Sequence, residues 1–295
     1  EISGVADLTA KDDEECIAKI KEFFSFMPGN AGEAPPIVPC DDPVDRKEEK
    51  LLDIVPMSHQ RMYDMYRVIH AIVDYGKIFD IKSNWAKNMI TCLARMNGRP
   101  VGIVANQPMV KAGVVDVPAA EKYAHFVEMC DAFSIPIILL ADVPGFMVGS
   151  ESERTGLVRR GMKTIYTIGN CTVPVLSVVI RKSYGLGGYI MGCRGIQTSL
   201  MLAWPTAQMG AMGIGGAVEI LHRKRIAESD EPEKLKEELV EEILGQLRAL
   251  PTAKNFGFDD VIDPRDTRPV LIRALESISH RKPNLPHKKH GINPI

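Results

Sequence analysis

The feature that most constrains the fold is a repeated unit: a short apolar run ends in a glycine-containing turn and is followed by a helix-like segment. Residues 135–140 and 173–180 are two such runs, and the turns at 142–146 and 181–188 follow them. Apolar runs without polar alternation are typical of strands that are covered on both faces. The repeat therefore predicts an α/β fold with layers of helix against sheet.

Other segments fit the same layered plan. Apolar runs at 88–92 and 101–105 flank Asn97 and Gly98, a pair typical of a tight hairpin turn. A helix is predicted over 117–133, since Pro118 lies in its first turn and apolar residues recur along one face. Periodicity and capping residues also predict helices over 12–24, 57–75, 155–168 (with Thr155 as N-cap), 213–227 and 232–247, and a last strand near 200–203.

The composition is that of an ordinary globular protein without a general attraction to polyanions. Lys and Arg number 36 against 38 Asp and Glu, so a net charge of -2 favours neither nucleic acid nor an anionic membrane surface. No apolar run reaches the roughly 20 residues that span a bilayer. The six cysteines lack a paired spacing and read as reduced thiols. We expect a cytoplasmic location, with the mitochondrial matrix as the alternative.

The common catalytic motifs are missing from the sequence, and the seven histidines lack metal-ligand spacing, so no metal site is expected. What remains is glycine at strand ends, where bare backbone N–H groups can face a ligand oxygen. Gly185, Leu186, Gly187 and Gly188 form the best candidate for such an oxyanion hole, in which each preorganised donor is worth roughly 3 to 4 kcal/mol. Weaker candidates are Gly145 with Gly149, and Gly213, Gly215 and Gly216. A tight turn or close packing without a ligand is the commoner explanation of a single such cluster, and several clusters at successive strand ends shift the balance modestly toward a ligand.

Several side chains allow two interpretations each. Asn106, Gln107 and Pro108 could line the cleft, since polar side chains at a strand end can orient a polar ligand, or could form a hydrogen-bonded turn. Phe146 could be an apolar wall for a ligand ring or part of the core, and Asp142 is expected to cap the turn before Gly145. Arg159, Lys163 and Lys182 could meet a carboxylate or a phosphate, although Arg and Lys are more often solvated.

The motifs at the strand ends occur together in one family. They read GRPVGIVANQP at 98–108, CDAF at 130–133, DVPGF at 142–146, RKSYG at 181–185, AWPTA at 203–207, MG at 212–213, GAVE at 216–219 and IDPRDTR at 262–268. In this order they resemble the carboxyltransferase (beta) subunits of biotin-dependent acyl-CoA carboxylases. The match is to the second, C-terminal crotonase-like domain of those subunits.

The resemblance implies a crotonase (ClpP)-like fold of repeated ββα units. Residues 1–45 would be the tail of a preceding N-terminal carboxyltransferase domain plus a linker, and residues 46–295 the C-terminal domain. It also implies that CO2 moves from carboxybiotin to the α-carbon of an acyl-CoA of acetyl or propionyl type. The amides of Leu186 and Gly187 would then face the ureido oxygen of biotin, and no side-chain base would be needed.

The acyl group is left open by one departure from the family pattern. Tyr189 and Ile190 lie where members vary with the acyl group, and Tyr189 stands where propionyl-type enzymes have Asp. By the same resemblance Gly145 and Phe146 join Asn106, Gln107, Pro108, Tyr189 and Ile190 as candidate contacts to biotin or the coenzyme A thioester.

The resemblance also implies partners. They are an N-terminal carboxyltransferase domain, a biotin carboxylase, a biotin carboxyl carrier that bears the biotin on a separate domain, and further copies in dimers to a hexamer. Two alternatives remain open. One is a biotin-dependent acyl-CoA decarboxylase or transcarboxylase subunit, and the other is a non-catalytic assembly subunit of the same fold.

Overall fold

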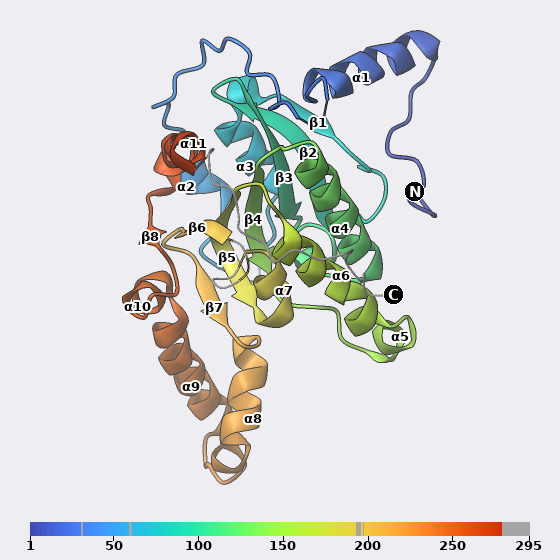
Figure 1. Ribbon diagram of the computed structural model, residues 1–295. Coiled ribbons are helices and arrows are strands. Elements are labelled where there is room, and N and C mark those ends of the chain that lie inside the picture. The colour runs from blue at the N-terminus through green and yellow to red at the C-terminus, as the bar shows by residue number, and fades with distance from the viewer. Residues whose placement is uncertain (31, 59–60, 193–195, 197, 279–295) are drawn as a thin grey trace.

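A single sheet forms the centre of the computed structural model, which describes residues 1–278 apart from 31, 59–60, 193–195 and 197 (Figure 1). The strand order is β1-β2-β3-β4-β5-β6-β8, and β7 pairs with the far end of β5. Strands β3 to β6 run parallel, whereas β1, β2 and β3 pair antiparallel at one edge. The strands are β1 (Ile78–Asp80), β2 (Met89–Met96), β3 (Arg99–Asn106), β4 (Ile137–Val143), β5 (Val175–Tyr184), β6 (Thr198–Ala203), β7 (Gln208–Gly210) and β8 (Asp260–Val261).

Helices cover both faces of the sheet (Figure 1). Buried side chains of α4 and α6 pack on one face, and those of α2, α3 and α11 pack on the other. The central strands β4 and β5 are buried along their whole length, as their uninterrupted apolar runs predict. The helices are α1 (Asp13–Ser25), α2 (Leu51–Ile54), α3 (Met65–Ile72), α4 (Val117–Ala132), α5 (Ser150–Arg154), α6 (Leu157–Asn170), α7 (Gly185–Ile190), α8 (Ile214–Ala227), α9 (Pro232–Leu247), α10 (Ala249–Lys254) and α11 (Thr267–Ile278).

The predicted hairpin and the helix after it are confirmed. Asn97 and Gly98 take φ values of 51° and 74° between β2 and β3, and the Asp74 carboxylate accepts both of their N–H groups at 2.9 and 2.7 Å. The helix α4 begins after Asp116, whose side chain accepts the N–H of Ala119 at 3.1 Å.

Two helix boundaries differ from the sequence prediction. Thr155 is not an N-cap: it ends α5, and α6 begins after Gly156, which adopts a left-handed conformation. The helix expected over 57–75 is confined to α3, because the Asp64 side chain accepts the N–H of Tyr66 at 3.1 Å and starts the helix there. Positions 59–60 lie outside the described residues.

Parts of the segment before residue 46 contact the rest of the chain, although α1 buries none of its side chains completely. Phe26 and Met27, which follow α1, belong to the core cluster beneath α4. The proline-rich run after them has no regular structure, as expected, and the Val38 N–H donates to the Gly98 carbonyl at 3.1 Å. The domain boundary between residues 45 and 46 stays a prediction.

The helices α8 and α9 form a hairpin that projects from the body of the molecule (Figure 1). Val218 is the buried residue of α8, and Leu239 is that of α9. Within the described ranges, no helix is both long and apolar enough to cross a membrane. Of the cysteines, Cys92, Cys130 and Cys171 are buried thiols, whereas Cys16 is exposed, and Cys193 lies outside the described ranges.

Candidate functional site

The candidate site begins where β5 runs directly into α7. Tyr184 is the N-cap of this helix, and Gly185 follows it with a φ of +54°. In any α-helix the first N–H groups after the N-cap have no acceptor within the helix. In α7 these groups belong to Gly185, Leu186 and Gly187. Among the described residues, no backbone carbonyl outside the helix accepts the N–H groups of Leu186 and Gly187.

Close packing makes glycine necessary at Gly187 and Gly188, which are both buried. A Cβ on Gly187 would lie 2.8 Å from the Cα of Gly145 and 2.8 Å from the Cγ2 of Val143. A Cβ on Gly188 would lie 2.5 Å from the Oγ of Ser183. The start of α7 is therefore pressed against the turn that follows β4, so the packing interpretation of these glycines holds alongside the ligand-binding one.

The turn after β4 is fixed from the other side. The Gly145 carbonyl accepts the N–H of Val115 at 3.0 Å, and the N–H of Met147 donates back to the Val115 carbonyl at 2.8 Å. The half-buried ring of Phe146 lies against α6, where its Cε2 is 2.4 Å from the position that a Cβ on Gly161 would take. These contacts favour the core interpretation of Phe146, and its role as a wall for a ligand stays a prediction.

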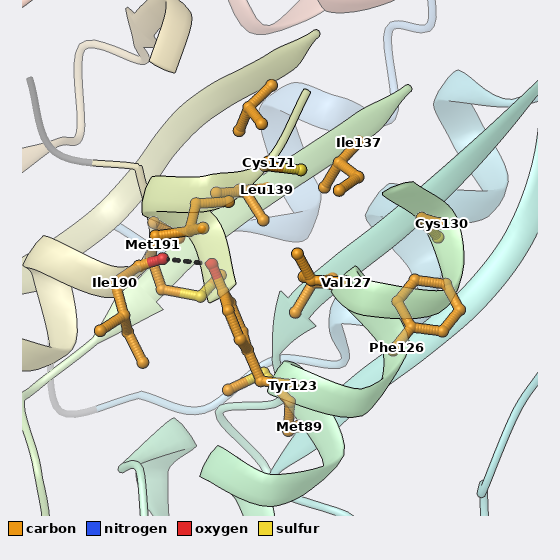
Figure 2. Close-up of a cluster of buried hydrophobic side chains, with 14 of the residues drawn as sticks. Met89, Tyr123, Phe126, Val127, Cys130, Ile137, Leu139, Cys171, Ile190 and Met191 are labelled. Atoms are coloured by element: carbon orange, nitrogen blue, oxygen red, sulfur yellow. Dashed lines mark hydrogen bonds between the residues drawn. The ribbon is translucent and has the colours of Figure 1, made fainter. Parts of the chain in front are cut away.

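The last two candidate residues of α7 point in opposite directions. Tyr189 is 40% exposed, whereas Ile190 is 0% exposed and belongs to the core cluster. The Tyr123 hydroxyl of α4 donates to the Ile190 carbonyl at 2.6 Å, which is the dashed line in Figure 2. Tyr189 can therefore meet a ligand directly, while the placement of Ile190 argues against direct contact.

Asn106, Gln107 and Pro108 are all buried at the end of β3. The Asn106 amide donates to the Gly113 carbonyl at 3.2 Å and accepts the N–H of Asp142 at 3.3 Å. The Gln107 amide donates to the Asp64 carboxylate at 2.7 Å. Their polar groups are thus engaged within the protein, which favours the hydrogen-bonded turn. A direct contact between these residues and a ligand stays a prediction that the geometry does not support.

A buried ion cluster at the ends of β4 and β5 has a structural role that the sequence prediction missed. Asp142 and Arg181 are 0% and 1% exposed, and the Arg181 Nε lies 3.0 Å from an Asp142 carboxylate oxygen. The other oxygen accepts the backbone N–H of Lys182 at 3.1 Å and lies 3.6 Å from the Lys182 Nζ. The expectation that Asp142 caps the turn before Gly145 is therefore wrong. The expectation of solvation is also wrong for Lys182, which is 8% exposed.

Burial dominates the electrostatics of this cluster. Burial lowers the pKa of the Lys182 ammonium, and the neighbouring Arg181 charge lowers it further against the opposing attraction of Asp142. Burial raises the pKa of Tyr184 to about 12. Burial also raises the pKa of the Tyr63 phenol, whose ring centroid lies 4.9 Å from the Arg181 guanidinium carbon. The strand ends thus carry cations in a largely dry environment, which strengthens their attraction for an anion.

The sequence did contain a signal for this cluster. Asp142 and the pair Arg181 and Lys182 each follow an apolar run that reads as a buried parallel strand, and such ends meet at one edge of the sheet. The described residues contain no group of three His, Cys, Asp or Glu side chains placed to hold a metal ion. The chemistry that the arrangement offers is therefore hydrogen bonding from main-chain amides beside buried positive charge.

Known proteins are similar to this chain along nearly its whole length. The profile of the family described as "Carboxyl transferase domain" matches residues 1–293. The carboxyltransferase subunit of propionyl-CoA carboxylase from Haloferax mediterranei is 40% identical over 99% of this chain and 57% of its own length. The methylmalonyl-CoA carboxyltransferase 12S subunit from Propionibacterium freudenreichii subsp. shermanii is 41% identical over 99% of this chain and 56% of its own length.

Solved structures agree with the sequence matches. A transcarboxylase 12S crystal structure, described as a hexamer assembly with methylmalonyl-coenzyme A and methylmalonic acid bound, superposes with a TM-score of 0.96 at 39% identity. It covers 100% of this chain and 56% of its own, so the chain spans a little over half the length of these relatives. With buried parallel strands that end in packed glycine turns, and with a family profile that matches nearly every residue, the chain belongs to the carboxyl transferase domain family.

Proposed function

We propose that this chain supplies the biotin-facing half of a carboxyltransferase site, which moves CO2 between carboxybiotin and the α-carbon of an acyl-CoA. The observation that carries the proposal is the start of α7, where no backbone carbonyl of the described residues outside the helix accepts the adjacent N–H groups of Leu186 and Gly187, in a turn that excludes any Cβ at Gly187. The names of the relatives support it, since they include propionyl-CoA carboxylase and methylmalonyl-CoA carboxyltransferase subunits.

In this proposal the chain contributes binding and charge stabilisation. Biotin supplies the carboxyl carrier and the nitrogen base of the reaction when it is bound. The amides of Leu186 and Gly187 would hold the ureido oxygen of bound biotin, and the contact between Gly187 and Gly145 fixes the direction of these amides beforehand. Tyr189, the exposed side chain of α7, meets the acyl end of the coenzyme A thioester.

We further propose that the site is completed by other chains or domains. The partners are an N-terminal carboxyltransferase domain, a biotin carboxyl carrier with its biotin carboxylase, and further copies in an oligomer. The coverage of 56–57% of the relatives and the hexamer described for transcarboxylase 12S support this arrangement. A cytoplasmic or mitochondrial-matrix location agrees with these partners.

The direct test is to delete one main-chain donor. Proline has no N–H and is tolerated in the first turn of a helix, so Leu186→Pro removes the Leu186 donor with little change to α7. We expect carboxyl transfer by the assembled enzyme to fall about 10²- to 10³-fold. Leu186→Ala is the matched variant, because it trims the side chain and keeps the amide, and it should lose less than about tenfold. Equal activity of Leu186→Pro and Leu186→Ala would refute the proposed oxyanion hole.

A second candidate function is the reverse direction, carried out by a decarboxylase or transcarboxylase subunit. Its support is that relatives named methylmalonyl-CoA decarboxylase subunit alpha are 37% and 39% identical to this chain. Transfer of ¹⁴C from carboxybiotin to acyl-CoA favours carboxylation, whereas loss of CO2 from malonyl-type esters alone favours the reverse. If neither occurs in a complete assembly, the chain is a non-catalytic assembly subunit.

A further inference from the structure

A large pocket lies between the carboxyl edge of the sheet and the projecting helices α8 and α9. Its volume is about 850 Å³. The floor comes from the end of β5 and from the segment that joins β6 to β7, and the far wall comes from α8 and α9. It does not include the α7 glycines. Its lining includes Lys182, Tyr184, Gln208, Ile214, Gly215 and Arg248.

The described lining of this pocket is positively charged. It includes Lys182 and Arg248 and no Asp or Glu. Arg248 also contacts Glu241, and its side chain is 55% exposed, so Lys182 is the buried cation of the pair. The Tyr184 hydroxyl does not balance the charge of Lys182, since it keeps its proton and donates it to the Gln208 side chain at 2.6 Å.

Beneath the pocket the buried ion cluster carries unbalanced charge. Arg181 and Lys182 contribute two positive charges, and Asp142, their carboxylate partner among the described residues, contributes one negative charge. Asp142 lies closer to Arg181, at 3.0 Å, than to the Lys182 ammonium, at 3.6 Å. Burying an uncompensated charge is costly, so a further anion beside Lys182 would stabilise the folded chain.

The first turn of α8 adds donors on the opposite side. Its first intrahelical bond runs from Ala217 N–H to the Gly213 carbonyl at 3.1 Å. The N–H groups of Ile214 and Gly215 therefore have no acceptor within the helix, and both residues line the pocket. A helix of fourteen residues also presents the positive end of its dipole there.

We propose that this pocket binds a small carboxylate-type anion, with Lys182 as its principal ligand and Arg248 as a second, more exposed contact. The chemistry fits hydrogen carbonate and the carboxylate of a short acyl chain, because both are planar oxyanions that a buried ammonium can hold. The inference rests on the charge and geometry of the pocket and not on the proposed carboxyl transfer. Either one can fail without the other.

The test measures thermal stabilisation of the full chain by sodium malonate, acetate and hydrogen carbonate, each compared with sodium chloride at equal ionic strength. A ligand that binds the folded state alone raises the melting temperature along a saturating curve. We expect saturation for wild type with at least one of the three anions. Saturation by hydrogen carbonate alone identifies a free inorganic ligand, and saturation by acetate or malonate identifies a carbon-borne carboxylate.

Three variants locate the site. Lys182→Met leaves Asp142 paired with Arg181, so the cluster becomes neutral, and the apparent Kd should rise at least about tenfold. Arg248→Gln should raise it about threefold, since that side chain is largely solvated. Gly215→Phe is designed to place a ring in the pocket while every charge is kept. A Cβ at this position would meet nothing within 4 Å, so the backbone tolerates the change. This variant should abolish the saturating response.

Gly245→Phe is the matched control. A Cβ at Gly245 on α9 also meets nothing within 4 Å, and this glycine does not line the pocket, so its response should equal that of wild type. The proposal is overturned if wild type shows no saturating response, or if Gly215→Phe responds as Gly245→Phe does. The second comparison remains decisive even if Lys182→Met fails to fold.

Discussion

Two helices of this molecule begin with clustered glycines, and the two clusters have opposite environments. At the start of α7, Gly187 and Gly188 are buried, and a Cβ on either would lie 2.5 to 2.8 Å from neighbouring atoms. At the start of α8, a Cβ on Gly213, Gly215 or Gly216 would meet nothing within 4 Å. In the sequence the two clusters look alike.

The difference shows what glycine is needed for in each place. The α7 glycines permit a close approach between the turns that follow two neighbouring parallel strands, so the packing of this chain explains them. The packing of this chain gives no reason for the α8 glycines. The packed turn can hold its amides in a fixed direction, whereas the open turn leaves space for a group from outside.

The largest expected effect concerns the ion cluster beneath the packed turn. Asp142→Asn removes the buried carboxylate that Arg181 and Lys182 share, and we expect the free energy of unfolding to fall by about 3–5 kcal/mol. Glu241 lies on α9, and Glu241→Gln breaks its exposed ion pair with Arg248. This change should lower the free energy of unfolding by less than about 1 kcal/mol. Urea denaturation of both variants measures the contrast, and similar losses would show that the two regions do not differ in this respect.

A glycine-to-alanine substitution in each turn tests whether the α7 turn is packed and the α8 turn is open. Gly187→Ala places a Cβ against Gly145 and should lower the free energy of unfolding by about 1–3 kcal/mol. Gly216→Ala should leave it unchanged or raise it by about 0.5–1 kcal/mol, because alanine loses less backbone entropy in a helix. Chemical denaturation of the pair gives both values. A destabilised Gly216→Ala variant would mean that the open turn is packed in solution.

A third helix start sharpens the comparison, because α4 is capped by a side chain in place of glycine. Burial alone would raise the pKa of Asp116, but hydrogen bonds from Lys111, Asn88 and Ala119 lower it below its usual value. A lowered pKa in the folded state stabilises the protein above the unfolded-state pKa of about 3.9, and this contribution is lost as the pH falls through the folded-state pKa. Asp116→Asn should therefore cost about 1 kcal/mol at pH 7 and progressively less below pH 4.

The measurement for Asp116 is the unfolding free energy of wild type and Asp116→Asn between pH 3 and pH 7. A difference between the two proteins that stays constant over this range would show that the Asp116 charge does not contribute.

The smallest expected change in stability is at Tyr189. This side chain is 40% exposed, so Tyr189→Asp should change the unfolding free energy by no more than about 0.5 kcal/mol. If Tyr189 meets the acyl group, the ratio of kcat/KM for propionyl-CoA to that for acetyl-CoA should change roughly tenfold or more. Tyr189→Phe keeps the ring and is the control. An unchanged ratio in Tyr189→Asp would remove this residue from the acyl site.

Long, regular segments were predictable from the sequence, and short or long-range features were not. The prediction for α9 coincides with the observed Pro232–Leu247, because Pro232 marks its start and charged residues recur at helical spacing. The short strands β1, β7 and β8 escaped prediction, since two or three residues carry no periodicity. Thr155 was misassigned because a threonine can follow a helix as readily as precede one.

The candidate site was predictable in its backbone and not in its side chains. The glycine motif located the start of α7, where no backbone carbonyl in the described part of the chain outside the helix accepts the N–H groups of Leu186 and Gly187. The environments of Asn106, Gln107, Ile190 and Lys182 depend on residues from other elements, such as Asp64, Tyr123 and Asp142. A local pattern cannot specify such partners. It can specify where a strand ends.

The buried Arg181 side chain also bears on how the chain folds, because it joins the end of β5 to the segment before α3. Its Nη1 donates to the Ser58 carbonyl at 3.0 Å and to the Arg61 carbonyl at 2.8 Å, across separations of 123 and 120 residues. Closing a loop of more than a hundred residues costs conformational entropy before the contact stabilises the chain, so such contacts form slowly. We therefore expect the floor beside Lys182 to be among the last parts to mature, well after α9 and the β2–β3 hairpin. During synthesis, a chain could hold native secondary structure throughout and still lack this corner.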